Sequence, residues 1–136
     1  MHKSRVLLAV VILAACNQRT AEEKLLKDIE PAISWVATLH FAAQQWSAGD
    51  VPGTYVRLTV DEAEKAFDKA TTSIDQSQAS KNLRDDVLRQ IQISRAAAKR
   101  LQQSIEKEDR DSVAKCAEQF ASASAVLQRL HQQESQ

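Results

Sequence analysis

Apolar side chains recur along the chain at steps of three and four residues, the spacing of one face of an α-helix. Four such stripes predict helices over residues 20–48, 53–76, 80–107 and 110–133. The stripes are Leu25, Ile29, Ala32, Val36, Leu39, Ala43, Trp46; Val56, Val60, Ala63, Phe67, Ala70, Ile74; Leu83, Val87, Ile91, Ser94, Ala98, Leu101, Ile105; and Val113, Cys116, Phe120, Ala123, Leu127, Leu130. Helices of this length joined by short connections predict an all-α fold, an antiparallel up-down-up-down four-helix bundle.

Two of the predicted connections have clear sequence signals and one does not. The segment Gly49–Gly53, with two glycines and a proline, is a strong turn signal, and the charged stretch Glu106–Asp111 offers Asp109 and Asp111 as N-caps. Between the second and third helices the core positions turn polar over Asp75–Asn82 without a glycine or proline. The alternative that these two helices form one long rod, which would favour a dimer, therefore stays open.

Proline lies inside the first predicted helix, at Pro31. Proline has no amide hydrogen to donate to the preceding turn. The residue therefore predicts a kink in this helix or a late start of its regular part.

Composition and charge agree with a helical protein that does not bind nucleic acid. The chain has only two glycines and two prolines, too few for a fold rich in tight turns. Beyond the first 15 residues, 16 basic and 18 acidic residues are interspersed along every segment. Nucleic-acid binders usually show a basic stripe that offsets phosphate charge, so no nucleic-acid partner is expected.

The first residues read as a secretory signal. A basic head with Lys3 and Arg5 precedes an unbroken apolar run, Val6–Ala15. The ten residues of this run would span only ~15 Å as a helix, about half of the hydrocarbon thickness of a bilayer. The segment is therefore too short for a permanent transmembrane helix and is expected to be removed.

The end of this leader, Leu13-Ala14-Ala15-Cys16, resembles the lipobox of bacterial lipoproteins. The resemblance implies cleavage before Cys16 and acylation of its thiol, so that membrane lipid holds the chain. It divides the chain into a signal peptide at 1–15, a lipidated tether at 16–19 and the helical domain at 20–136. Asn17 after the cysteine implies a bacterial envelope location at the outer membrane, facing the periplasm. The alternative is an ordinary signal peptide followed by a chance cysteine.

The mature domain resembles no specific family, and we expect a non-enzymatic structural or protein-interaction role with no cofactor. Covalent haem attachment would need Cys-x-x-Cys-His, which is absent. Haem bound without covalent attachment, as in a cytochrome b562-like bundle, would need a methionine ligand, and the only methionine, Met1, is expected to be removed with the leader. A di-metal site would need Glu-x-x-His, which is also absent. An envelope protein partner would meet the ends that project from the membrane, at Gly49–Gly53 and Glu108–Asp111. The alternative function is a periplasmic bundle that binds a small ligand or a metal.

Four residues stand out as candidates for a site or an interaction. Helix spacing places His40 and Cys116 on neighbouring helices with a difference in height of only ~3 Å. Val60 and Ala98 should complete that layer, and a hydroxyl of Thr59 or Ser94 is the expected partner of the imidazole. Trp46 lies on one strip of the first helix with Trp35. The strip is expected to be core and core margin, with Tyr55 and Pro52 closing its far end, and the alternative is that it binds a hydrophobic ligand or partner.

Overall fold

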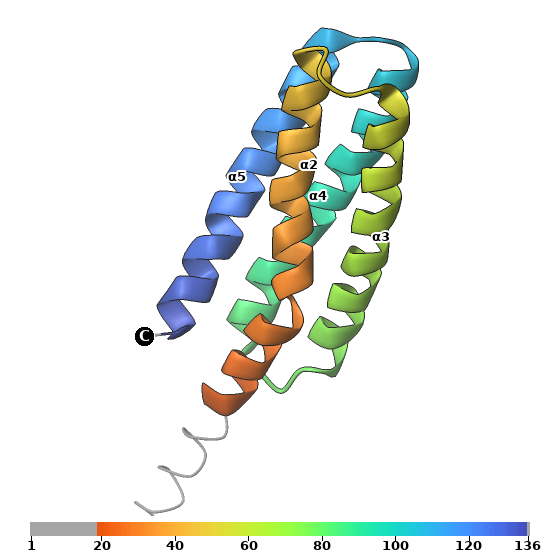
Figure 1. The fold of residues 1–136 in the computed structure, drawn as a ribbon. Coiled ribbons are helices and arrows are strands. Elements are labelled where there is room, and N and C mark those ends of the chain that lie inside the picture. The colour runs from red at the N-terminus through yellow and green to blue at the C-terminus, as the bar shows by residue number, and fades with distance from the viewer. Residues whose placement is uncertain (1–18, 136) are drawn as a thin grey trace, which may run out of the picture.

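The computed structural model describes residues 19–135, and within this range the prediction of an all-helical fold is confirmed (Figure 1). A helix over residues 19–28 is followed by α2 (Glu30–Ser47), α3 (Gly53–Gln76), α4 (Lys81–Glu106) and α5 (Arg110–Ser135). These bounds differ from the predicted ranges by at most two residues at the outer ends of each helix. The predicted signal peptide and the lipidated Cys16 lie outside the described residues.

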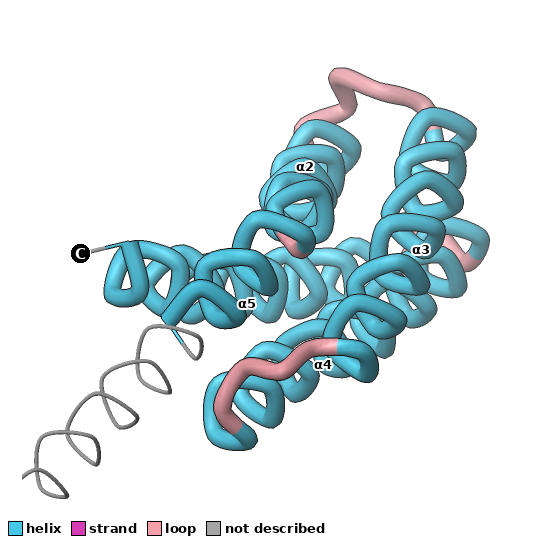
Figure 2. Tube along the Cα trace, turned by 90° about the horizontal axis from the view of Figure 1, so that it is seen from below, coloured by secondary structure: helices cyan, strands magenta, loops and turns pink. Residues whose placement is uncertain are grey.

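Each long helix packs on the next one in the chain, and α5 packs back on α2. Seen from below in Figure 2, the four helices follow one another around a shared interior. The connections 48–52 and 107–109 lie at one end of the molecule (Figure 1). The connection 77–80 lies at the other end, together with residue 19 and the end of α5. We call these the distal end and the proximal end.

The first predicted helix is interrupted near Pro31, as the sequence indicated. Helical geometry breaks at Ile29, and α2 then begins with Pro31 in its first turn. The amides of Ile29 and Ile33 still donate to Leu25 and Ile29, each at 3.1 Å, so the chain stays coiled on both sides of the break. Proline is tolerated in a first helical turn because no amide hydrogen is needed there.

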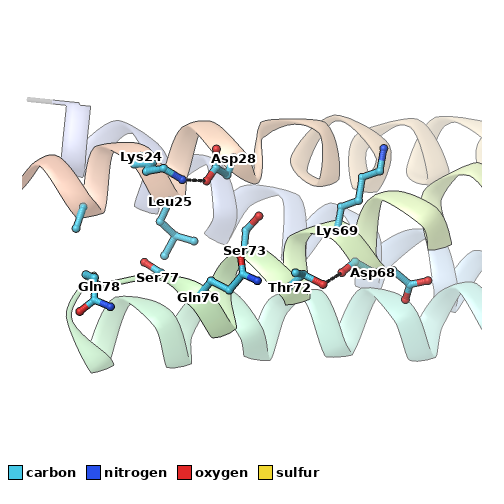
Figure 3. Close-up of a pocket in the computed structure, with 11 residues that line it drawn as sticks. Lys24, Leu25, Asp28, Asp68, Lys69, Thr72, Ser73, Gln76, Ser77 and Gln78 are labelled. Atoms are coloured by element: carbon cyan, nitrogen blue, oxygen red, sulfur yellow. Dashed lines mark hydrogen bonds and ion pairs between the residues drawn. The ribbon is translucent and has the colours of Figure 1, made fainter.

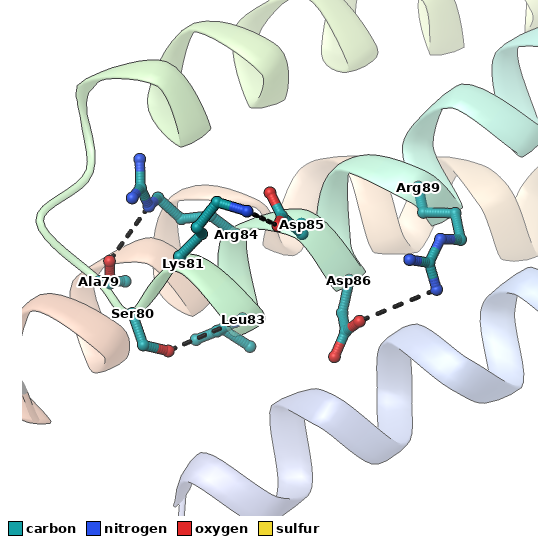
Figure 4. Close-up of polar contacts among 8 residues, drawn as sticks. All are labelled: Ala79, Ser80, Lys81, Leu83, Arg84, Asp85, Asp86 and Arg89. Carbon is teal, nitrogen blue, oxygen red and sulfur yellow. Dashed lines mark hydrogen bonds and ion pairs between the residues drawn. The ribbon is translucent and has the colours of Figure 1, made fainter.

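The chain turns between α3 and α4, so the alternative of a single long rod is wrong. The Ser80 hydroxyl accepts a hydrogen bond from the amide of Leu83 at 3.3 Å and caps the start of α4 (Figure 4). The guanidinium of Arg84 donates to the carbonyl of Ala79 at 3.1 Å. Capping side chains thus replace the glycine or proline that usually marks such a turn.

The core follows the four predicted stripes and combines two phenylalanines with many small residues. Phe67 and Phe120 are its largest fully buried side chains. The alanines Ala32, Ala43, Ala63, Ala70, Ala97, Ala98 and Ala123 belong to the same cluster. Small side chains let helices approach closely, and the two aromatic rings fill the space that remains.

One core position carries a polar group without a partner. The Ser94 side chain on α4 is fully buried, and its hydroxyl makes no hydrogen bond to any described residue. A buried hydroxyl that loses its water without gaining a partner lowers the stability of the fold.

We expect Ser94→Ala to raise the free energy of unfolding by about 1 kcal/mol, because it removes an unsatisfied donor and improves helix propensity. Ser104→Ala is the matched control. The Ser104 hydroxyl is also buried, but it donates to the carbonyl of Arg100 at 2.7 Å and lies 2.6 Å from the Ser112 hydroxyl. This control should lower stability by about 1 kcal/mol. Urea unfolding followed by circular dichroism measures both changes, and destabilisation by Ser94→Ala would contradict the expectation.

Candidate functional site

His40 forms a hydrogen bond between two helices at the height that the sequence indicated. Its Nδ1 lies 2.9 Å from the carbonyl oxygen of Ala117, the residue after Cys116 on α5. Because a carbonyl only accepts, Nδ1 carries the proton and donates. The expected hydroxyl partner is wrong, since the Thr59 hydroxyl donates to the carbonyl of Tyr55 at 2.8 Å and the Ser94 hydroxyl has no partner among the described residues. His40 is half-buried at the α2–α5 seam rather than enclosed in a core layer.

Cys116 is a buried free thiol, exposed over only 2% of its surface. Burial raises the pKa of this thiol, and the nearby Arg100 guanidinium opposes that rise. A thiol with a raised pKa is a poor nucleophile at neutral pH, because little thiolate is present. The position therefore suits a small apolar side chain in the core.

The two aromatic candidates near the distal end differ in environment. Trp46 is partly buried and packs against the core, as does Trp35, so the prediction of a core-margin strip is confirmed. Tyr55 is 42% exposed, and its closing of the end of the strip stays a prediction. The turn at Pro52 places Gly53 beside the Trp46 indole, where a side-chain carbon on the glycine would lie 3.9 Å from Nε1 of the ring.

A groove of about 750 Å³ lies at the proximal end, between the helix 19–28 and the last turns of α3 (Figure 3). The break at Ile29 sets the direction of the first helix and thus one wall of the groove. Lys24 and Asp28 form an ion pair of 2.9 Å on that wall. On the other wall Asp68 pairs with Arg95 of α4 at 2.8 Å. The carboxylates of the groove are therefore already neutralised by neighbouring cations.

A smaller groove of about 320 Å³ follows the seam between α2 and α5. Nε2 of His131 lies 3.0 Å from a Glu30 carboxylate oxygen across this seam. His40 and His131 thus both connect α2 to α5. Sequence patterns could not indicate either partner, since the pairs are 77 and 101 residues apart in the chain.

Metal-binding and membrane-spanning features are both absent from residues 19–135. Within that range, no group of three or more histidine, cysteine, aspartate or glutamate side chains is placed to hold a metal ion. No helix in the same part of the chain is long and apolar enough to cross a membrane.

Comparisons of the chain with models of protein families, with curated protein sequences and with solved structures find no match.

Proposed function

We propose that the protein is a lipid-anchored lipoprotein of the bacterial envelope, with a non-enzymatic structural or protein-interaction role at the periplasmic face of the outer membrane. The motif Leu13–Cys16 carries this proposal, because it follows a basic head and a short apolar run. The mature part is proposed to be an antiparallel up-down-up-down four-helix bundle tethered through acylated Cys16. The packing order of α2 to α5 supports that topology.

The start of the described chain supports a close approach to the membrane. Residue 19, the first that the structure describes, is helical and lies three positions after the proposed acylation site. Three residues span at most about 11 Å, so the proximal end would lie next to the bilayer. With 26 residues in α4, the bundle is about 39 Å long, and the distal end would project away from the lipid.

Three large apolar side chains are exposed in the distal half and would be available to a partner. Phe41 on α2 is 57% exposed, while Tyr55 and Leu58 on α3 are 42% and 61% exposed. Tyr55 and Leu58 lie three residues apart and share a helix face. The connection 48–52 joins α2 to α3, so Phe41 and Leu58 lie about 9 and 8 Å below that turn.

Site-specific crosslinking in the native envelope tests the interaction role. A photoreactive phenylalanine derivative at Leu58 is expected to form a discrete adduct with an envelope protein. The same derivative at Ile93, an exposed residue of α4, is the matched control and should form little of that adduct. Phe41→Asp should lower the Leu58 adduct by about tenfold without changing the unfolding temperature, since a central apolar contact contributes ~1–2 kcal/mol to binding. Equal adducts from both positions would contradict the proposal.

A further inference from the structure

A pocket of about 360 Å³ opens at the distal end, where α2, α3 and α4 meet. We call it the distal pocket. Its lining residues are Trp46, Gly53, Thr54, Arg57, Ile105, Glu106 and Glu108. The pocket thus combines an indole from the end of α2, a guanidinium from the start of α3 and two carboxylates from the end of α4 and the connection after it.

The charged groups of the distal pocket are not neutralised by the rest of the described chain. Arg57, Glu106 and Glu108 form no ion pair or side-chain hydrogen bond with any residue in the range 19–133. The ion pairs in that range all lie elsewhere in the bundle, and none involves the segments 46–58 and 105–115 that surround the pocket. At the end of α4 the amides of Lys107, Glu108 and Asp109 already donate to the carbonyls of Gln103, Ile105 and Ser104. The negative charge of the pocket therefore comes from the carboxylates of Glu106 and Glu108.

The floor of the distal pocket is closely packed and therefore preformed. Ile105 is only 6% exposed, and Trp46 is half-buried beside it. A side-chain carbon added at Gly53 would lie 2.9 Å from Cγ2 of Ile105, closer than real contacts allow. Glycine at this position lets α3 begin against the end of α4, and this contact holds the walls of the pocket together.

We propose that the distal pocket binds a basic amino acid, either free or as the C-terminal residue of a peptide. The charges of the lining residues, one positive and two negative, sum to −1. A basic amino acid carries a carboxylate and a side-chain cation, which complement these two kinds of charge. Its carboxylate would pair with the Arg57 guanidinium, which offers planar, two-pronged hydrogen bonding. Its side-chain cation would lie near Glu106 and Glu108 and over the Trp46 indole, where cation–π attraction adds to charge attraction. The inference goes beyond the proposed envelope role and does not depend on the lipid anchor.

Fluorescence of Trp46 in the full-length chain tests this proposal. Trp35→Phe leaves Trp46 as the one tryptophan of the chain. Titration with L-lysine at low salt is expected to give a saturable change with a dissociation constant of about 1 mM, as suits an open pocket. Cadaverine, which lacks the carboxylate, should bind about fivefold more weakly, because one exposed charge pair is lost. Glycine, which lacks the side-chain cation, should give no saturable change.

Variants separate the two halves of the pocket. Replacing both carboxylates, Glu106→Gln with Glu108→Gln, should abolish the response to lysine and to cadaverine. Arg57→Gln should lower the affinity for lysine to that for cadaverine, and it should not lower the affinity for cadaverine. Glu118→Gln, an exposed carboxylate on α5, is the control and should change neither affinity. Circular dichroism establishes that each variant is folded.

The peptide Gly-Gly-Lys, with a free or an amidated C-terminus, distinguishes the two sources of the ligand. Both sources predict that the free-acid peptide binds more tightly than its amide. Binding of the free acid as tight as that of lysine would assign the site to a peptide C-terminus, and much weaker binding would assign it to the free amino acid. The proposal would be overturned if lysine gave no saturable response. It would also be overturned if lysine and cadaverine bound with equal affinity and Arg57→Gln changed neither affinity. Neither result would affect the crosslinking test of the envelope role.

Discussion

Replacing Cys16 by serine is expected to release the protein from the membrane or to leave an uncut precursor. Each methylene buried in the bilayer contributes ~0.8 kcal/mol, so two or three acyl chains hold a protein stably where one chain would not. The helices of residues 19–135 include none that could cross a membrane in place of the proposed lipid anchor. Fractionation of cells together with labelled palmitate measures both the location and the acylation.

Cys116→Ser is the matched control for this experiment, because it removes the second of the two cysteines. Cys116 is buried in the core and has a raised pKa, so it should not take up lipid. This variant should keep its label and its membrane location. Labelled lipid that persists in Cys16→Ser, or that disappears in Cys116→Ser, would contradict the assignment of the anchor.

Replacing Phe67 by alanine is expected to lower the free energy of unfolding by about 3–5 kcal/mol, the usual cost of removing a buried aromatic ring. Phe67 is fully buried on α3 in the main apolar cluster. The loss combines the transfer free energy of the ring with the cavity that it leaves among neighbouring alanines. Such a loss is a large part of the total stability of a small domain.

Phe41→Ala removes the same ring from an exposed position and provides the comparison. Phe41 is 57% exposed, so this change should alter stability by at most about 0.5 kcal/mol. Urea unfolding of both variants, with the slope of the transition compared as well as its midpoint, measures the difference. Similar losses in the two variants would show that the assigned core is wrong.

The existence and the bounds of the helices could be predicted from the sequence because they depend on local properties. Apolar spacing alone indicated the stripes that include Phe67 and Phe120, and both residues are fully buried. Local capping also acted as expected at the start of α5, where the Asp109 carboxylate accepts a hydrogen bond from the amide of Ser112 at 3.1 Å. The turn before α4 is harder to predict, since serine signals a cap less distinctly than glycine or proline signals a break.

The sequence by itself determined the helical periodicity and the break near Pro31, and it predicted the lipid anchor through the lipobox-like motif. Each of these properties depends on residues that are only a few positions apart. Only the tertiary structure decided that His40 donates to the carbonyl of Ala117 and that Ser94 has no partner among the described residues. It also decided that Arg57, Glu106 and Glu108 line one pocket with Trp46. These arrangements depend on the rotation and axial offset of each helix against its neighbours. A shift of one residue along a helix turns a side chain by about 100°, and interhelical packing rather than local spacing sets that angle.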